Sequence, residues 1–281
     1  MPELPEVESI RRSLEPLVSG RRIVRAEILD ARLVRSEPTL DLAARLEGES
    51  IAALDRRGKY LLVRFESGRT LVIHLRMTGS LRHRQSGGDL LAHERARLEL
   101  DDGSQLVYRD VRRFGTWRLL DAVELASYLA ARLGPEPLGP DFSPELLSGR
   151  LAGRRTALKA ALLDQRTLAG LGNIYVDEAL WSARLNPAAE AGSLSRQATL
   201  RLYGAIRETL ALGIARQGAT LRDYALPGGE TGSMQNEFRV YGREGEPCER
   251  CGGPIAKTRV AGRGTWFCPR CQRHRDRRDR S

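Results

Sequence analysis

Residues 60–75 read Tyr60-Leu61-Leu62-Val63-Arg64-Phe65-Glu66-Ser67-Gly68-Arg69-Thr70-Leu71-Val72-Ile73-His74-Leu75. Two runs rich in β-branched and aromatic residues flank Ser67-Gly68, a dipeptide typical of a hairpin turn. The sequence therefore predicts antiparallel strands over 60–65 and 70–75. This hairpin fixes the fold class of the N-terminal part of the chain.

Further short β-rich runs lie on both sides of this hairpin, at Ile23-Val24, 96–100 and 105–108. Asp102-Gly103 supplies a second hairpin turn between the last two runs. Many short strands joined by tight turns indicate an antiparallel β-sandwich or barrel-like domain.

Helical patterns flank this β-rich region. Val7, Ile10, Leu14 and Leu17 recur at helical spacing before Gly20, which predicts an amphipathic helix over 5–18. A second helix is expected near 121–133, before Gly134. We therefore expect an N-terminal domain over residues 1–133, an antiparallel β-sandwich with flanking helices.

The remainder of the chain has a different, mostly helical pattern. Gly134-Pro135-Glu136-Pro137-Leu138-Gly139-Pro140 cannot continue a helix and predicts an interdomain linker. The expected fold class is α+β, with a C-terminal helical domain that carries a mobile Gly-rich loop over 217–235. The predicted segments are a linker over 134–142, the helical domain over 143–235, a zinc-finger hairpin over 236–273 and a disordered basic tail over 274–281.

The only cysteines are Cys248, Cys251, Cys268 and Cys271, spaced Cys-x2-Cys-x16-Cys-x2-Cys. This spacing is typical of a zinc ribbon, in which two cysteine pairs form a tetrahedral four-thiolate site. Such a site has no open coordination position, so the predicted Zn²⁺ is structural.

Composition points to a polyanionic partner. The 281 residues carry a formal net charge of +10, and the pI is near 10.0, which is typical of proteins that bind nucleic acid. No apolar run reaches the length of a membrane span and no signal peptide is present, so we expect a cytoplasmic protein. Only Lys59, Lys159 and Lys257 are lysines among 46 basic residues.

The N-terminus, Met1-Pro2-Glu3-Leu4-Pro5-Glu6, carries a candidate nucleophile. Removal of Met1 would leave a secondary amine on Pro2, and α-amino groups titrate near ~7.7–8.0. Such an amine attacks a carbonyl-like carbon to give an iminium ion, with Glu3 or Glu6 as acid or base. The alternative is a helix start, with Pro5 at the first position and acids in the first turn.

Several motifs together resemble one family. They are Pro2-Glu3-Leu4-Pro5-Glu6-Val7-Glu8, Asp110-Val111-Arg112-Arg113-Phe114-Gly115, Leu133-Gly134-Pro135-Glu136-Pro137-Leu138, Gly170-Leu171-Gly172-Asn173-Ile174-Tyr175, and Val240-Tyr241-Gly242-Arg243 before the zinc ribbon. In this order they resemble the formamidopyrimidine-DNA glycosylase / endonuclease VIII family, and its formamidopyrimidine branch in particular. The resemblance covers nearly the whole chain.

The resemblance implies a monomeric bacterial base-excision repair enzyme that removes oxidised purines from duplex DNA and then cuts the backbone. Pro2 would attack C1′ of the damaged nucleotide while Glu3 protonates the sugar ring oxygen; β- and δ-elimination follow without a catalytic metal. Lys59 would contact the phosphate beside the lesion. Glu6 matches an acid near the lesion pocket, with a first-turn helix acid as the alternative.

The resemblance also implies a helix–two-turn–helix DNA-binding motif and a set of DNA contacts. Met77, Arg112 and Phe114 would fill the space left when the damaged base leaves the stack. Met77 and Phe114 on their own would read as core residues, and Asn173 as a helix N-cap. The remaining predicted DNA contacts are His74, His93, Lys159, Asn173, Tyr241, Lys257 and Arg263.

One segment departs from the family. Gly232-Ser233-Met234-Gln235-Asn236 replaces an aromatic pair that many members carry, which leaves the preferred lesion open. The nearest alternative is endonuclease VIII specificity for oxidised pyrimidines. A non-catalytic lesion-binding protein and a zinc-ribbon nucleic-acid adaptor are further alternatives, which the intact Pro2, Glu3 and Lys59 and the large N-terminal domain disfavour.

Overall fold

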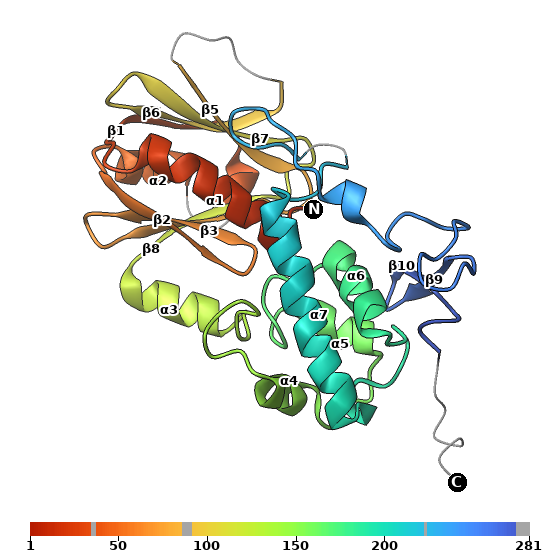
Figure 1. The fold of residues 1–281 in the computed structure, drawn as a ribbon. Coiled ribbons are helices and arrows are strands. Elements are labelled where there is room, and N and C mark those ends of the chain that lie inside the picture. The colour runs from red at the N-terminus through yellow and green to blue at the C-terminus, as the bar shows by residue number, and fades with distance from the viewer. Residues whose placement is uncertain (35–37, 86–91, 222–223, 274–281) are drawn as a thin grey trace. The chain divides into compact units, whose positions relative to one another are not determined.

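The computed structural model describes residues 1–34, 38–85, 92–221 and 224–273 (Figure 1). The chain divides into two compact units: unit 1 is Met1–Ala131 with Ile214–Gln235, and unit 2 is Arg132–Gly213 with Asn236–Ser281. None of the helices in the described ranges has the length and apolar character needed to cross a membrane. The tail predicted over 274–281 lies outside the described residues.

Unit 1 contains two four-stranded antiparallel sheets. The first has the order β1 (Ile23–Ile28), β6 (Glu94–Leu100), β7 (Ser104–Asp110), β5 (Gly79–Gln85). The second has the order β2 (Ile51–Arg57), β3 (Tyr60–Phe65), β4 (Thr70–His74), β8 (Thr116–Leu120). The predicted hairpin is present, with Tyr60 opposite His74 and Val63 opposite Leu71. The antiparallel β fold class is confirmed.

Helix α1 (Leu4–Val18) closes the core of unit 1. Val7, Ile10 and Leu14 are fully buried and pack in one cluster with residues of both sheets, such as Leu61 and Leu98. Burying a side chain of this size stabilises the fold by about 1.5–3 kcal/mol. Three residues of the predicted spacing therefore form the face that packs on the sheets. The fourth, Leu17, is exposed, and Val18 is buried in its place.

The other helices of unit 1 are α2 (Thr39–Leu46), α3 (Ala122–Ala130) and a 3₁₀ turn at Ala31–Val34. Strands β2, β5 and β8 and helix α2 have no clear signal in the local sequence pattern and were not predicted. Strand β5 reads Gly-Ser-Leu-Arg-His-Arg-Gln and β2 ends in Asp-Arg-Arg. Such polar strands lack the apolar alternation that identifies strands from sequence, and pairing with their neighbours forms them.

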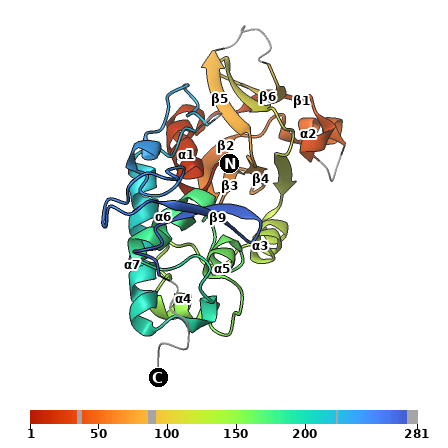
Figure 2. The same ribbon diagram turned by 90° about the vertical axis from the view of Figure 1, so that its right-hand side faces the viewer.

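Unit 2 contains α4 (Pro144–Leu151), α5 (Leu158–Leu163), α6 (Asn173–Ala183), most of α7 (Arg196–Ala215), the hairpin β9 (Ala256–Val260) and β10 (Arg263–Phe267), and a 3₁₀ turn at Ala191–Ser193. A further 3₁₀ turn, Met234–Glu237, begins in unit 1 and ends in unit 2. Helices α5 and α6 flank the turn of residues 164–172. Helix α6 lies beside the β9–β10 hairpin in both views (Figure 1, Figure 2).

Two segments differ from the predicted boundaries. The linker predicted over 134–142 packs into unit 2, because Gly134 N–H donates to Gln165 O (2.8 Å) and Pro135 O accepts from Ala169 N–H (3.0 Å). The Gly-rich loop over 217–235 was predicted to be part of the helical domain. It belongs instead to unit 1, which includes Ile214–Gln235.

The loop joins unit 1 through polar contacts that local sequence patterns do not encode. Arg82 of β5 donates to Leu226 O (2.6 Å). Met234 N–H donates to Gly218 O (3.0 Å), and the Met234 side chain is buried. Arg222 and Asp223 of this loop lie outside the described residues.

Candidate active site and nucleic-acid interface

The N-terminal segment holds Pro2 and Glu3 at the start of α1. Both are buried, whereas Met1 is 44% exposed. Glu3 is the N-cap residue, with an extended backbone (φ −101°), and its N–H donates to Glu6 Oε2 (2.8 Å). The helix start therefore places two carboxylates beside Pro2, where the partial positive charge of the helix N-terminus favours them.

Glu6 connects this segment to the loop that follows α7. Its side chain is 2% exposed. The second oxygen, Oε1, accepts a hydrogen bond from Ala219 N–H (2.8 Å). One buried carboxylate thus accepts two backbone amides that are far apart in sequence, and a carboxylate bound in this way is well stabilised. The helix-acid role of Glu6 holds, together with a second role as a tether.

Glycines allow the close approach at this tether. Gly218 has a φ of +80°, and a Cβ there would lie 2.8 Å from Glu6 Cγ. A Cβ on Gly232 would lie 2.2 Å from Gly218 O. Tyr224 Oη donates to Gln217 O (2.9 Å), and burial raises the pKa of Tyr224 well above its usual range, so the hydroxyl keeps its proton. The base of the loop is thereby fixed against α1.

Lys59, Tyr60 and His74 form a second group in unit 1. Lys59 is buried in the turn between β2 and β3. The rings of Tyr60 and His74 pack edge to face with centroids 4.6 Å apart, and His74 Nδ1 accepts from Arg76 N–H (3.0 Å). Burial, with the charges of Arg76 and Lys59, lowers the pKa of His74 to about 3. The imidazole is therefore neutral at physiological pH, and Nε2 is left as its N–H donor.

Met77, Arg112 and Phe114 lie on two loops that share one carboxylate. Asp110 Oδ1 accepts from Thr78 Oγ1 (2.5 Å), and Oδ2 accepts from Gly115 N–H (2.7 Å). The Arg112 guanidinium stacks on the Phe114 ring at 4.7 Å.

Exposure separates these side chains from the core. Met77 is 36% and Phe114 is 43% exposed, so neither is a core residue of unit 1.

The two loops that carry Met77, Arg112 and Phe114 are also held by an ion pair and by a close contact at a glycine. Arg113, with a φ of 58°, pairs with Asp30 through two hydrogen bonds (2.5 and 2.7 Å), which lower the pKa of Asp30. A Cβ on Gly115 would lie 1.7 Å from the Tyr108 hydroxyl. His93 is exposed, and its carbonyl accepts from Asp110 N–H (3.0 Å), so this predicted DNA contact belongs to the same cluster.

The predicted DNA contact at Lys159 is not supported. Its side chain is fully buried, and its Nζ lies 2.7 Å from Asp177 Oδ1, which is also fully buried. Nζ also donates to Gly264 O of β10 (2.9 Å). Burial raises the pKa of Asp177 to about 7, while Lys159 opposes this shift. Lys159 therefore positions the zinc hairpin on α6 and is not available to DNA.

Asn173 makes a parallel contact to the hairpin. It is the first residue of α6, whose N-cap is Gly172, so the N-cap alternative for Asn173 does not hold. Its Nδ2 donates to Gly264 O (3.0 Å). Its Oδ1 has no hydrogen-bond partner among the described residues.

The hairpin carries Arg263 next to its tip. Ala261 and Gly262 form the turn with φ of 48° and 74°, and Arg263 is exposed. Trp266 N–H donates to Asp177 Oδ2 (3.1 Å), which fixes β10 to α6. Lys257 is exposed and pairs with Glu244 (3.3 Å).

Glu178 is a positioning residue to which the sequence analysis assigned no role. Its carboxylate accepts from the N–H groups of Arg239, Val240 and Tyr241 at 2.9, 3.0 and 2.8 Å. Burial raises the pKa of Glu178, and these three donors oppose the shift. The Tyr241 ring packs on Trp266 at 4.5 Å. The only feature of the sequence that could have pointed to this role is the pair of adjacent acids, Asp177-Glu178, in α6.

The four cysteines form a metal-binding geometry. Their Sγ atoms all lie within 4.8 Å of one another, with Cys248–Cys271 at 3.9 Å and Cys251–Cys268 at 3.5 Å. Zinc–sulfur bonds of about 2.3 Å imply sulfur–sulfur edges of roughly 3.8 Å, so these residues fit Zn²⁺. Trp181 Nε1 lies 3.5 Å from Cys248 Sγ and can stabilise its thiolate.

Comparison with known proteins matches three segments of the chain to three known domains. Residues 1–117 match the formamidopyrimidine-DNA glycosylase N-terminal domain, residues 133–225 match the formamidopyrimidine-DNA glycosylase H2TH domain, and residues 245–273 match a zinc finger found in FPG and IleRS. The chain belongs to the formamidopyrimidine-DNA glycosylase family. The zinc-finger match and the cysteine geometry together confirm a structural zinc.

Relatives of the glycosylase family cover nearly the whole chain. A formamidopyrimidine-DNA glycosylase from Symbiobacterium thermophilum is 50% identical over 97% of this chain and 89% of its own length. One from Heliobacterium modesticaldum is 48% identical over 97% and 100%. The structure of Lactococcus lactis Fpg with DNA containing an abasic site superposes with a TM-score of 0.91, at 41% identity over 96% of this chain and 99% of that one.

We expect Glu6→Gln to release the base of the loop. The amide has one acceptor oxygen, so either Glu3 N–H or Ala219 N–H loses its partner, at a cost of about 1–3 kcal/mol. Amide hydrogen exchange at Ala219 should become faster and the free energy of unfolding should fall. Glu15→Gln, at a partly exposed position of α1, is the control. Unchanged protection of Ala219 in Glu6→Gln would contradict the tether.

We expect His74 to make the fold sensitive to acid. Its pKa is about 3 in the folded protein and near ~6.5 when unfolded, so the unfolded chain takes up the proton first. The contribution of His74 to the free energy of unfolding is therefore complete above pH ~6.5. It falls as the pH drops below this value, by up to about 1.4 kcal/mol per pH unit. In urea titrations from pH 7 to pH 4, His74→Gln should show a shallower decline than the wild type and than His93→Gln. Parallel declines would refute this role.

We expect Cys268→Ser to lose the zinc. The wild-type protein should contain about one zinc per chain, because a closed four-thiolate site holds one ion. Metal analysis after gel filtration should find far less in Cys268→Ser, and wild-type content in the hairpin control Thr258→Ser. Equal zinc in both variants would overturn the assignment.

Proposed function

We propose that this protein is a bifunctional DNA glycosylase and AP lyase that removes oxidised purines, such as 8-oxoguanine and formamidopyrimidines, from duplex DNA. The observation that carries the proposal is the N-terminal segment: Pro2 and Glu3 at the start of α1, tied by Glu6 to the loop of residues 217–219. Relatives of the same family named formamidopyrimidine-DNA glycosylase support it. So does a Lactococcus lactis structure with DNA containing FAPY-dG, which is 40% identical.

The nucleophile is the Pro2 amine, freed when the exposed Met1 is removed. About a tenth of an amine with a pKa near ~8 is neutral at pH 7. Its nitrogen forms a bond to C1′, and the damaged base leaves with the electrons of its bond to C1′ and takes up the proton that the Pro2 nitrogen loses. Glu3 gives its proton to the ring oxygen as the C1′–O4′ bond breaks, which yields the iminium ion.

The iminium then drives strand cleavage. It withdraws electrons from C2′, so a proton leaves C2′ and the 3′ phosphate departs; a second elimination releases the 5′ phosphate. Lys59, beside His74 in the second group of unit 1, is assigned to the phosphate next to the lesion, because an ammonium neutralises a phosphate as a point charge. The zinc is assigned a structural role, because all four of its ligands are thiolates.

The exposed loop residues are assigned to the duplex. Met77, Arg112 and Phe114 would fill the gap left by the flipped base, and Arg112 suits the edge of the unpaired base. Arg263 and Asn173 would bind backbone phosphate; His74, His93, Tyr241 and Lys257 are proposed as further contacts. We place catalysis in residues 1–133, and the enzyme at the bacterial chromosome in the cytoplasm.

A second candidate is activity on oxidised pyrimidines. Two observations favour it: the loop segment 232–236 lacks an aromatic pair, and a Lactococcus lactis relative has been solved with DNA containing an oxidised pyrimidine. Excision rates for 8-oxoguanine opposite C and thymine glycol opposite A decide between them. Faster excision of 8-oxoguanine supports the purine assignment, and faster excision of thymine glycol overturns it.

We expect Pro2→Gly to lower excision by at least about 100-fold, a loss typical of a misplaced reacting group. Glycine removes both the secondary amine and the ring that orients it. Binding to lesion DNA should change little, because the DNA contacts remain. Pro5→Ala, at the neighbouring proline of α1, is the matched control. Single-turnover excision near the wild-type rate in Pro2→Gly would eliminate the proline mechanism.

A further inference from the structure

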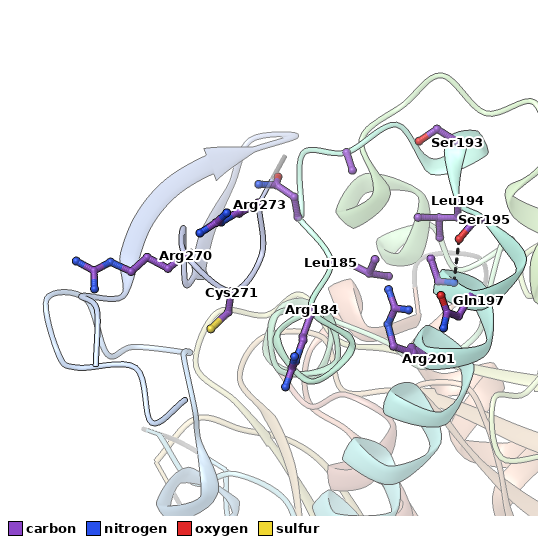
Figure 3. Close-up of a pocket in the computed structure, with 13 residues that line it drawn as sticks. Arg184, Leu185, Ser193, Leu194, Ser195, Gln197, Arg201, Arg270, Cys271 and Arg273 are labelled. Carbon is purple, nitrogen blue, oxygen red and sulfur yellow. Dashed lines mark hydrogen bonds between the residues drawn. The ribbon is translucent and has the colours of Figure 1, made fainter. Parts of the chain in front are cut away.

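A cavity of about 530 Å³ lies in unit 2 at the C-terminal end of α6 (Figure 3). Three segments line it: the residues after α6, the start of α7, and the end of the zinc finger. Its cationic residues are Arg184, Arg201, Arg270 and Arg273, which we call the arginine pocket. None of these residues is among the DNA contacts assigned above.

The charges of the arginine pocket are not balanced by acids. No carboxylate lines the cavity, and within residues 1–34, 38–85, 92–221 and 224–273 none forms an ion pair with its four arginines. Arg201 donates to Ala183 O at the end of α6 (3.2 Å). Guanidinium groups form charge-assisted hydrogen bonds with anions, so an anion in the cavity would find several donors on its wall.

Helix α7 adds to the positive potential. Its first turn contains no acidic residue, although acids usually stabilise that end of a helix. Ser195 Oγ accepts from Ala198 N–H (3.2 Å), the dashed bond in Figure 3. Ser195, Gln197 and Ala198 all line the cavity, so the α7 N-terminus opens into the pocket.

Arg184 occupies a backbone conformation that favours glycine or asparagine. It ends α6 with φ 58° and ψ 41°, a left-handed geometry that is uncommon for residues other than glycine, asparagine and aspartate.

We propose that the arginine pocket binds backbone phosphates of a nucleic-acid segment other than the one held near Arg263 and Asn173. This inference rests on the proposed function. Asn173 begins α6 and Arg184 follows its end, so a helix of this length separates the two places by roughly 16 Å at 1.5 Å per residue. Guanidinium groups bind phosphate through paired hydrogen bonds.

The test variant is Arg184→Asn combined with Arg273→Gln. Asparagine tolerates the left-handed conformation, so the helix end is kept while its charge is lost. The matched control, Arg22→Gln with Arg150→Gln, removes the same net charge from exposed positions outside the pocket. Thermal unfolding midpoints close to that of the wild type establish that the pocket variant and the control variant are both folded.

Binding of a labelled undamaged duplex is measured by anisotropy over a range of salt concentrations. Each phosphate contact contributes about 0.9 to the slope of log K against log salt. The pocket variant should therefore have a slope lower by about 1–2, whereas the control keeps the wild-type slope. Equal slopes in the pocket variant and the control would overturn the proposal.

A second measurement separates the possible sources of phosphate. If inorganic pyrophosphate raises the thermal midpoint of the wild type but not of the pocket variant, and the DNA slopes are equal, the pocket holds a free phosphate compound and the nucleic-acid proposal fails. Excision of 8-oxoguanine is measured on the same proteins. If the wild-type protein does not excise 8-oxoguanine, the proposed function is wrong. The salt slopes on undamaged DNA test the pocket separately, because they do not require excision.

Discussion

The carboxylate of Glu6 is the constraint on which the candidate active site depends. It is buried and accepts two backbone amides, one from Glu3 and one from Ala219. A buried carboxylate that loses such partners is strongly destabilising, so the start of α1 and the base of the following loop are held together. Pro2 thus lies on a segment whose position depends on the loop, and a change in the loop would reach the nucleophile.

Unit 2 uses the same device for a different purpose. Asp177 accepts from Trp266 N–H, and Glu178 accepts from three successive amides that begin at Arg239. Lys159 balances the charge of Asp177 inside the protein. Carboxylates of α6 therefore set the place of the zinc hairpin and of Arg263, while the zinc closes the hairpin itself. Both units fix exposed functional residues by burying acids against backbone N–H groups.

The sequence predicted features that depend on local pattern. The hairpin of residues 60–75, the face of α1 and the four-cysteine site follow from periodicity and spacing. Strand β5 and the burial of Lys159 were missed, because both arise from partners distant in sequence. The tether from Glu6 to Ala219 had no local signal either, since a first-turn acid looks the same with or without it. Family resemblance supplied residue roles, and it misplaced Lys159 because motif position does not report burial.

The central claim is that the Pro2 amine becomes covalently joined to the damaged nucleotide. The most direct measurement is to incubate the protein with an 8-oxoguanine duplex and sodium borohydride, digest the product and locate the attached sugar by mass spectrometry. We predict a reduced adduct on Pro2, in chains that have lost Met1. An adduct on Lys59 or another lysine, or rapid excision with no adduct on a processed N-terminus, would contradict the account.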